Sequence, residues 1–219
     1  MATRQVLTEL AALWQRSSGI EVSIESVGGV DAAKRVQAGE AFDGVVLASD
    51  AIEKLVAGGQ VLAGSRHDLL QSSVAVAARA GTPVPDIRTE SALRSAIEAA
   101  PTIGYSTGPS GVALIKLFER WGILEALQPR IVQAPAGVPV GTLVARGEVA
   151  LGFQQLSELM HLEGICMVGT LPEAVGITTI FSAAICSASV QVQALTRLLA
   201  FMASSEAAQI KLRHGMQPA

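Results

Sequence analysis

The fold is decided by a strand-to-helix junction in the middle of the chain, Thr102-Ile103-Gly104-Tyr105-Ser106-Thr107-Gly108-Pro109-Ser110-Gly111. Its first four residues indicate a short buried strand, and the helical spacing of apolar residues that follows predicts a helix over 110–121. The same alternation of strand and helix extends from this junction in both directions. It predicts an α/β fold with largely parallel sheets, in which the ligand-binding loops follow the strand ends.

The predicted elements cover most of the chain. Strands are expected at 20–24, 43–48, 73–78, 102–105, 130–133, 149–153, 164–168 and 177–186. Helices are expected at 3–16, 31–37, 50–57, 89–100, 110–121, 139–146, 190–202 and 205–213, with Thr89 as the cap of the fourth. The helices after Cys186 follow a long strand and are expected to complete a sheet that begins early in the chain.

The composition excludes several classes of protein. Half of the residues are apolar, 16% are charged and the mean hydropathy is +0.43, which excludes an intrinsically disordered chain. Sixteen basic and nineteen acidic residues give a net charge of −3, and no basic cluster points to nucleic acid as a partner. The most apolar stretch, 181–203, is interrupted by polar residues before it reaches the roughly 18 apolar residues of a membrane-spanning helix. We therefore expect a core-rich globular protein that is not embedded in a membrane.

The sequence gives no sign of a targeting segment, a metal site or a cofactor. The first residues, Met1-Ala2-Thr3-Arg4-Gln5, lack the charged, apolar and cleavage regions of a signal peptide. Cys166 and Cys186 lack CxxC spacing and lie in apolar runs, so we expect inert buried thiols. The three histidines lack the spacing of metal ligands, and we expect neither metal nor cofactor.

Three strand-to-helix junctions favour an anionic ligand. They lie at 26–30, 105–111 and 134–139, and each combines glycine with the start of a predicted helix. The first amides of a helix are unsatisfied donors with partial positive charge, and serine or threonine hydroxyls add further donors. Taken singly, each junction also fits a simple turn with a capped helix. Together they predict an anion site, and none matches a nucleotide-binding loop or a GxSxG nucleophile turn.

Five segments resemble the periplasmic molybdate-binding-like proteins, which are solute receptors of ABC transporters with the type II periplasmic-binding fold. The segments are Val27-Gly28-Gly29-Val30, Ala38-Gly39-Glu40-Ala41-Phe42-Asp43-Gly44-Val45-Val46-Leu47, Gly104 to Gly111, Ala145-Arg146-Gly147-Glu148-Val149-Ala150-Leu151-Gly152-Phe153-Gln154-Gln155, and Ser204-Ser205-Glu206-Ala207-Ala208. The resemblance implies two α/β lobes that close on an anion. Lobe I is expected at 1–76 with 182–219, and lobe II at 77–181.

The resemblance also implies which residues contact the ligand. Carried over to this sequence, they are Ala2, Thr3, Arg4, Gly28, Gly29, Ser72 or Ser73, Ser106, Thr107, Ser110, Gly137 and Val138, with Gln154 at the mouth of the cleft. Arg4 departs from the pattern of molybdate receptors, whose sites resemble arrangements of amides and hydroxyls without a charged side chain. A guanidinium suits a carboxylate through paired hydrogen bonds, although Arg4 pointing into solvent is an equal alternative.

Three functions follow as hypotheses. The first is a periplasmic, monomeric solute-binding protein that delivers a small anion, either an oxyanion such as molybdate or a polycarboxylate, to an ABC transporter permease. The second is an isomerase of the aconitate type on the same fold, which requires a general base. The candidates for that base are Tyr105, Glu158 and His161, although Tyr105 also fits a cleft-wall aromatic, and Glu158 and His161 a solvated helix face. The third is a cytosolic ligand-sensing domain.

Family members begin with a strand that supplies the first ligand loop, whereas this chain begins at the helix that follows it. In a doubly wound sheet that strand lies between the strands expected at 20–25 and 43–48. Its absence would leave a gap of about two strand spacings, roughly 9–10 Å. We therefore expect a longer natural product with an N-terminal strand and an export signal.

Overall fold

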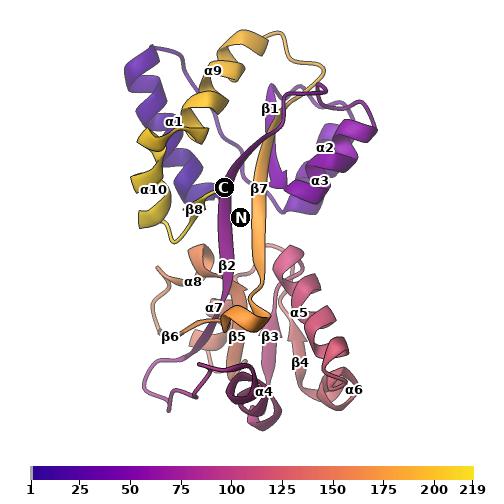
Figure 1. Ribbon diagram of the computed structural model, residues 1–219, viewed down its shortest axis with the longest axis vertical. Coiled ribbons are helices and arrows are strands. Elements are labelled where there is room, and N and C mark those ends of the chain that lie inside the picture. Colours follow the sequence, from indigo (N-terminus) through magenta and orange to yellow (C-terminus); the bar gives the residue numbers. More distant parts are fainter. Residues whose placement is uncertain (1) are drawn as a thin grey trace. The chain divides into compact units, whose positions relative to one another are not determined.

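The computed structural model describes residues 2–219, and the chain divides into two compact units. Unit 1 consists of Met1–Ser72 and Thr179–Ala219, and unit 2 consists of Ser73–Thr178. Two strands cross the division, β2 (His67–Arg79) on the way into unit 2 and β7 (Thr178–Ile185) on the way out (Figure 1). Each unit therefore owns part of strand β2.

Unit 2 is a five-stranded mixed sheet with helices around it (Figure 1). Its strand order is β6 (Ile165–Thr170), β2, β5 (Leu151–Gln155), β3 (Ile103–Tyr105) and β4 (Ile131–Gln133). Strand β3 is parallel to both β4 and β5, whereas β2 is antiparallel to β5 and β6. The helices are α4 (Glu90–Ala99), α5 (Pro109–Arg120), α6 (Leu124–Leu127), α7 (Val140–Ala145) and α8 (Leu156–Leu159), with 3₁₀ turns at Gln128–Arg130 and Glu173–Val175.

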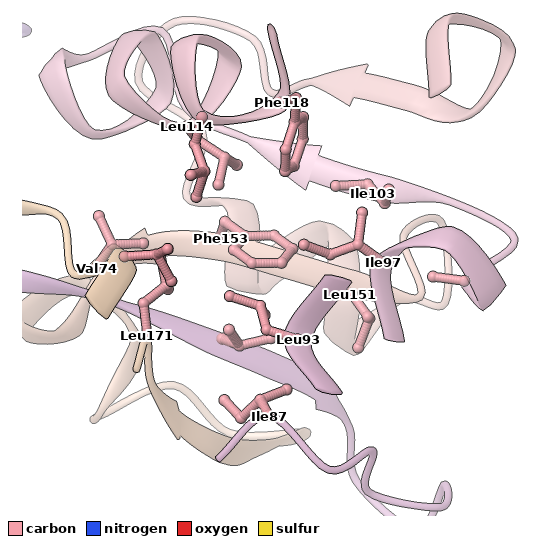
Figure 2. Packing of buried hydrophobic residues seen from close by; sticks show 14 of the residues in the cluster. Val74, Ile87, Leu93, Ile97, Ile103, Leu114, Phe118, Leu151, Phe153 and Leu171 are labelled. Carbon is pink, nitrogen blue, oxygen red and sulfur yellow. The ribbon is translucent and has the colours of Figure 1, made fainter. Parts of the chain in front are cut away.

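The main core of unit 2 forms where apolar stripes of α4 and α5 cover the sheet (Figure 2). Phe153 of β5 lies among Leu93 and Ile97 of α4 and Leu114 of α5, and these side chains are all buried. The ring of Phe118 meets that of Phe153 edge to face, with centroids 6.4 Å apart. The helical spacing of these residues explains why α4 and α5 turn one face inward, and Thr89 caps α4 as predicted by accepting the Ala92 amide.

Helix α7 packs unusually close to the sheet because the strands beneath it carry glycine. A Cβ atom at Gly152 of β5 would lie 2.5 Å from Cγ2 of Val144, and one at Gly104 of β3 would lie 3.0 Å from Cγ1 of Val140 and 2.8 Å from Cγ1 of Val149, which follows the helix. Real side chains do not approach this closely, so only glycine permits the packing. Because α7 packs closely on β3 and β5, the segment that leads into it, 134–139, is held near the ends of these strands.

Unit 1 combines five helices with the strands β1 (Gly44–Ala48), β7, the first half of β2, and β8 (Gln217–Pro218). Strand β1 is antiparallel to β7, and β8 is antiparallel to β2. The helices are α1 (Arg4–Ser18), α2 (Gly29–Gln37), α3 (Ser49–Ala57), α9 (Val192–Ala203) and α10 (Ala208–Arg213), with a 3₁₀ turn at Ser205–Ala207. One apolar cluster joins α1, α9 and α10 to β2 and β7, and a second lies between α2, α3 and β1.

The α/β class is confirmed, but two details of the prediction are wrong. The segment 20–24 forms no strand within residues 2–219, although Val22 and Ile24 are half-buried against the α1 cluster and their neighbours Glu21 and Ser23 are exposed. Alternation thus predicted the facing of the side chains correctly, but a strand also needs a partner for its backbone groups. The sheets are mixed rather than largely parallel, because β2 and β7 run opposite to the strands beside them.

The two cysteines differ in burial. Cys186 is buried, and burial raises the pKa of its thiol to about 11, whereas Cys166 is only half-buried, contrary to expectation.

No helix within residues 2–219 is both long and apolar enough to cross a membrane.

Candidate functional site

Three parallel strands of unit 2 end at the same edge of the sheet. Tyr105 at the end of β3 is in register with Gln133 of β4 and with Phe153 near the end of β5. We call this edge, with the segments 106–110, 134–139 and 156–158 that follow the strands, the strand-end edge. Because β2 is antiparallel to β5 and Val74 pairs with Gln155, Ser73 also lies there. The junctions predicted at 105–111 and 134–139 are therefore brought together.

The first segment of the strand-end edge presents a pair of hydroxyl groups. Oγ of Ser106 lies 3.0 Å from Oγ of Ser110, with Ser110 only 3% exposed and Thr107 exposed. Helix α5 begins at Pro109 without a side-chain cap and without an acidic residue in its first turn. Gly111 allows the loop to fold against the helix, because a Cβ atom there would lie 1.8 Å from the carbonyl oxygen of Ser106. The hydroxyl pair and the positive end of the helix at this point favour an anion, although the Gly111 and Val112 amides already donate to the Gly108 carbonyl.

The second segment uses part of its donor capacity within the protein. The Val138 amide donates to the carbonyl of Pro135 at 3.0 Å, and the Ala134 amide donates to the carbonyl of Tyr105 at 2.9 Å. Gly137 is exposed and has a φ of +79°, which favours glycine. Because the Val138 amide is engaged, its predicted role as a backbone donor to ligand requires this turn to open.

Gln154 is deeply buried, contrary to the prediction that it lies at the mouth of a cleft. Its side chain is 3% exposed, and its Oε1 accepts a hydrogen bond of 2.7 Å from the amide of Val140, at the start of α7. The reason is the close seat of α7 on β5, which encloses the side chain. Gln154 thus links the end of β5, which leads into segment 156–158, to the start of α7, which follows segment 134–139.

Glu158 of α8 is half-buried and not on a solvated helix face as predicted. Burial raises the pKa of its carboxyl group. His161, just beyond α8, is exposed, and Tyr105 is half-buried against the main core of unit 2. A buried carboxyl group such as that of Glu158 holds its proton more tightly than one in water.

Three further serines lie near the ends of β2 and β5. Oγ of Ser73 lies 3.4 Å from Oγ1 of Thr178. In unit 1, Ser72 is 1% exposed, and its hydroxyl has no hydrogen-bond partner among residues 2–219. In unit 2 the hydroxyl of Ser157 is likewise buried without a partner in that part of the chain. Sequence reasoning missed Ser157 because α8, with four residues, is too short to show a helical period.

The remaining predicted residues lie at two helix starts in unit 1. Thr3 precedes α1 and is buried, Ala2 packs against the α1 cluster, and Arg4 is exposed as the first helical residue. Gly28 and Gly29 begin α2, where Gly28 is extended and provides no side-chain cap. The Arg4 side chain forms no ion pair within residues 2–219. A cation at a helix start is unfavourable by itself, and an anion bound there would relieve this.

Comparison with known proteins decides the family. A family model described as bacterial extracellular solute-binding protein matches residues 1–217. The chain belongs to this family. An aconitate isomerase from Pseudomonas sp. is 38% identical to this solute-binding family member over 218 residues, which cover 97% of the chain and 83% of the relative.

Solved structures confirm the predicted periplasmic-binding fold of this family member. The periplasmic molybdate-binding protein of Azotobacter vinelandii superposes with a TM-score of 0.79 at 22% identity, covering 98% of this chain and 95% of the other. A structure of PEB3 bound to L-phospholactate superposes with a TM-score of 0.75 at 14% identity, covering 100% and 96%. At these identities the likeness concerns the fold alone.

Proposed function

We propose that this solute-binding protein captures a small anion, and that the anion is a polycarboxylate. The observation that carries the proposal is the serine pair at the start of α5, where Ser106 and the buried Ser110 lie at a helix start that has no side-chain cap. One serine hydroxyl donates to the other, which leaves the second hydroxyl and the backbone amide of Ser110 as donors for an anion that leaves water. Capture for an ABC transporter, in the periplasm, is the corresponding physiological role.

Two observations favour a polycarboxylate over an oxyanion such as molybdate. The relative at 38% identity is named for aconitate, which is a tricarboxylate. Arg4 is exposed at the start of α1, and a planar guanidinium pairs with a carboxylate through two charge-assisted bonds. A tetrahedral dianion is satisfied by amides and hydroxyls without it.

Isothermal titration with molybdate, tungstate, sulfate, citrate, cis-aconitate and trans-aconitate tests the proposal. Ser110→Ala should weaken the bound anion by about 1–3 kcal/mol, because it removes a hydroxyl donor to a charged group. Ser95→Ala, at an exposed position of α4, is the matched control and should bind as the wild type does. Binding of none of the six anions would refute the function, and unchanged affinity of Ser110→Ala would remove Ser110 from the site.

The carboxylate preference has its own test. Arg4→Ala should weaken citrate or aconitate binding by about 1.5–3 kcal/mol, the usual worth of a hydrogen bond to a charged group, and molybdate binding much less. Arg16→Ala, at an exposed position near the other end of α1, serves as the control for a general loss of positive charge. Equal losses for both ligand types after Arg4→Ala would argue against a polycarboxylate.

A second candidate function is the isomerisation of aconitate, favoured by the identity to the isomerase and by the half-buried Glu158. Interconversion of the cis and trans isomers moves a proton along the allylic system, so it needs one group that accepts and returns a proton. Proton NMR of cis-aconitate with the wild-type protein should show the signal of trans-aconitate growing with time. Heat-inactivated protein is the control, and binding without interconversion would leave only the transport function.

A further inference from the structure

Strand β6 is the outer strand of the unit 2 sheet, and one of its edges has no partner. Within residues 2–219 it pairs with β2 alone, and it lies at the margin of unit 2 in Figure 1. An edge strand presents unpaired N–H and C=O groups, which proteins usually protect with charged residues or proline. The residues Ile165–Thr170 include neither a charged side chain nor a proline. This edge is therefore suited to pairing with a further strand.

The register with β2 identifies the backbone groups that face the open edge. The Ala80 amide donates to the Gly164 carbonyl at 3.0 Å, so these two residues form a hydrogen-bonded pair of the antiparallel ladder. Because such pairs alternate along a ladder, Cys166 bonds to β2, whereas Ile165 and Met167 direct their N–H and C=O groups away from it. Those groups form no backbone hydrogen bond within residues 2–219.

A β-bulge limits the regular part of this edge to three residues. The register shifts between Val76 and Ala77 of β2, and Gly169, beyond the shift on β6, has a φ of +146°. A bulge disrupts the ladder locally and bends the strand. The segment 165–167, which we call the free edge, is therefore the part of β6 that is regular enough to pair again.

The free edge is complementary to a second copy of itself. When two free edges meet antiparallel about a two-fold axis, Ile165 of each copy lies opposite Met167 of the other. Every outward N–H then meets a C=O, so the partial charges of the two edges match. The side chains that meet are apolar, and the exposed Glu163 carboxylates of the two copies lie at opposite ends of the paired edges. No pair of like charges opposes this contact.

Cys166 lies at the centre of the free edge and is only half-buried. Its Sγ lies 3.9 Å from the carbonyl oxygen of Met167, which faces the open edge. In the two-fold arrangement Cys166 lies opposite itself as a non-hydrogen-bonded pair, with Cα atoms about 4.5 Å apart. This separation is within the range that a disulfide bridges. The thiol can therefore report whether two copies meet here.

We propose that the free edge of β6 is an interface between two copies of this chain, which pair antiparallel about Cys166. The proposal goes beyond the anion-binding function and departs from the monomer expected from the sequence. Because the contact is short, the dimer is weak and reversible. Ile165 pairs with Arg79, at the other end of the unit 2 part of β2 from Ser73, so the interface is separate from the strand-end edge.

Sedimentation equilibrium tests the interface. The average mass of the wild type should rise from 22.6 kDa toward twice that value as the concentration increases. Cys166→Ser should behave in the same way, because backbone groups make the contact. Cys166→Lys should remain monomeric, because it places two ammonium groups directly opposite each other. Ser95→Lys, at an exposed position of α4, is the matched control for added charge and should dimerise as the wild type does.

Met167→Pro provides a second way to break the contact. It removes an N–H that faces away from β2, so the ladder within unit 2 keeps its hydrogen bonds and the variant should be monomeric. The melting temperature shows whether each variant is folded, and Met167→Pro decides the question if Cys166→Lys is not. A wild-type mass of 22.6 kDa at every concentration would overturn the proposal, and so would folded variants that dimerise as the wild type does.

Disulfide cross-linking tests the register in a Cys186→Ser background. Under oxidation with copper phenanthroline, the remaining Cys166 should link two chains. When Cys166→Ser is added, a mixture of Ile165→Cys and Met167→Cys chains should cross-link. Met167→Cys alone should not, because its two copies are diagonal neighbours about 7–8 Å apart. Cross-linking of Met167→Cys with itself, or a dimer in which Cys166 does not cross-link, would overturn the two-fold pairing.

Discussion

Gly111 shows how one missing side chain shapes the serine pair. A Cβ atom at this position would lie 1.8 Å from the carbonyl oxygen of Ser106, which is backbone and has no room to rotate away. Gly111→Ala should therefore displace Ser106 from Ser110 and destabilise the protein by about 1–3 kcal/mol, the range of overpacking. Chemical denaturation measures the loss, and anion titration measures the effect on the site.

Gly108 provides the matched control for this substitution. A Cβ atom there would lie 3.7 Å from Oγ of Ser106, an ordinary contact, and its φ of −81° suits any residue. Gly108→Ala should cost at most about 1 kcal/mol, because the position before a helix prefers glycine to alanine. An equal loss for both variants would mean that the Ser106 carbonyl moves freely.

At the residue scale, the positions of the polar loops were predictable from the sequence, but the burial of the side chains around them was not. Ser106 and Ser110 could be chosen because a strand, a glycine and a helix stand in immediate succession. The burial of Gln154 was not predictable, because it results from the close packing of α7 on β5, which depends on glycines in β3 and β5. Contacts between segments distant in sequence leave no periodic signal.

At the element scale, the seat of α7 makes a quantitative prediction. Gly152→Ala would place a Cβ atom 2.5 Å from Val144 and 3.0 Å from Val140, both β-branched and stiff. It should destabilise the protein by about 1–3 kcal/mol and lengthen the Gln154–Val140 hydrogen bond. The midpoint of urea denaturation measures the first effect, and exchange of the Val140 amide measures the second.

Val144→Ala is the companion substitution. It removes the methyl group that Gly152→Ala would strike, so the double variant should lose less stability than the sum of the single variants. Strict additivity would show that α7 does not rest on Gly152. The approximate range of α7 was predictable from the sequence, but its close packing against β5 was not.

At the scale of the whole molecule, an ion pair joins the beginning and the end of unit 1. Glu9 of α1 contacts His214 at 2.8 Å and also Arg213. The hydrogen bond from His214 lowers the pKa of Glu9, and Arg213 adds to the effect. A lowered folded-state pKa contributes stability above the unfolded-state value, near 4.5, and the contribution is lost as the pH falls through the folded-state pKa.

Glu9→Gln should therefore lower the melting temperature at pH 6 and have a progressively smaller effect toward pH 3. Glu21→Gln, an exposed residue beyond the same helix, should have little effect at either pH. Thermal unfolding from pH 3 to pH 7 measures both variants. A difference for Glu9→Gln that is independent of pH would mean that the carboxylate charge does not stabilise the α1–α10 contact.

The discontinuity of unit 1 has a consequence for biosynthesis. Unit 2 is one continuous run, Ser73–Thr178, whereas unit 1 needs Thr179–Ala219 as well as its first part. Because the ribosome releases the chain from its N-terminus at about 5–20 residues per second, unit 2 is complete while α9 and α10 are still unmade. Leu10 and Trp14 of α1, which these helices cover in the finished protein, stay exposed on the nascent chain during that interval. A holding chaperone would bind the nascent chain at this stage.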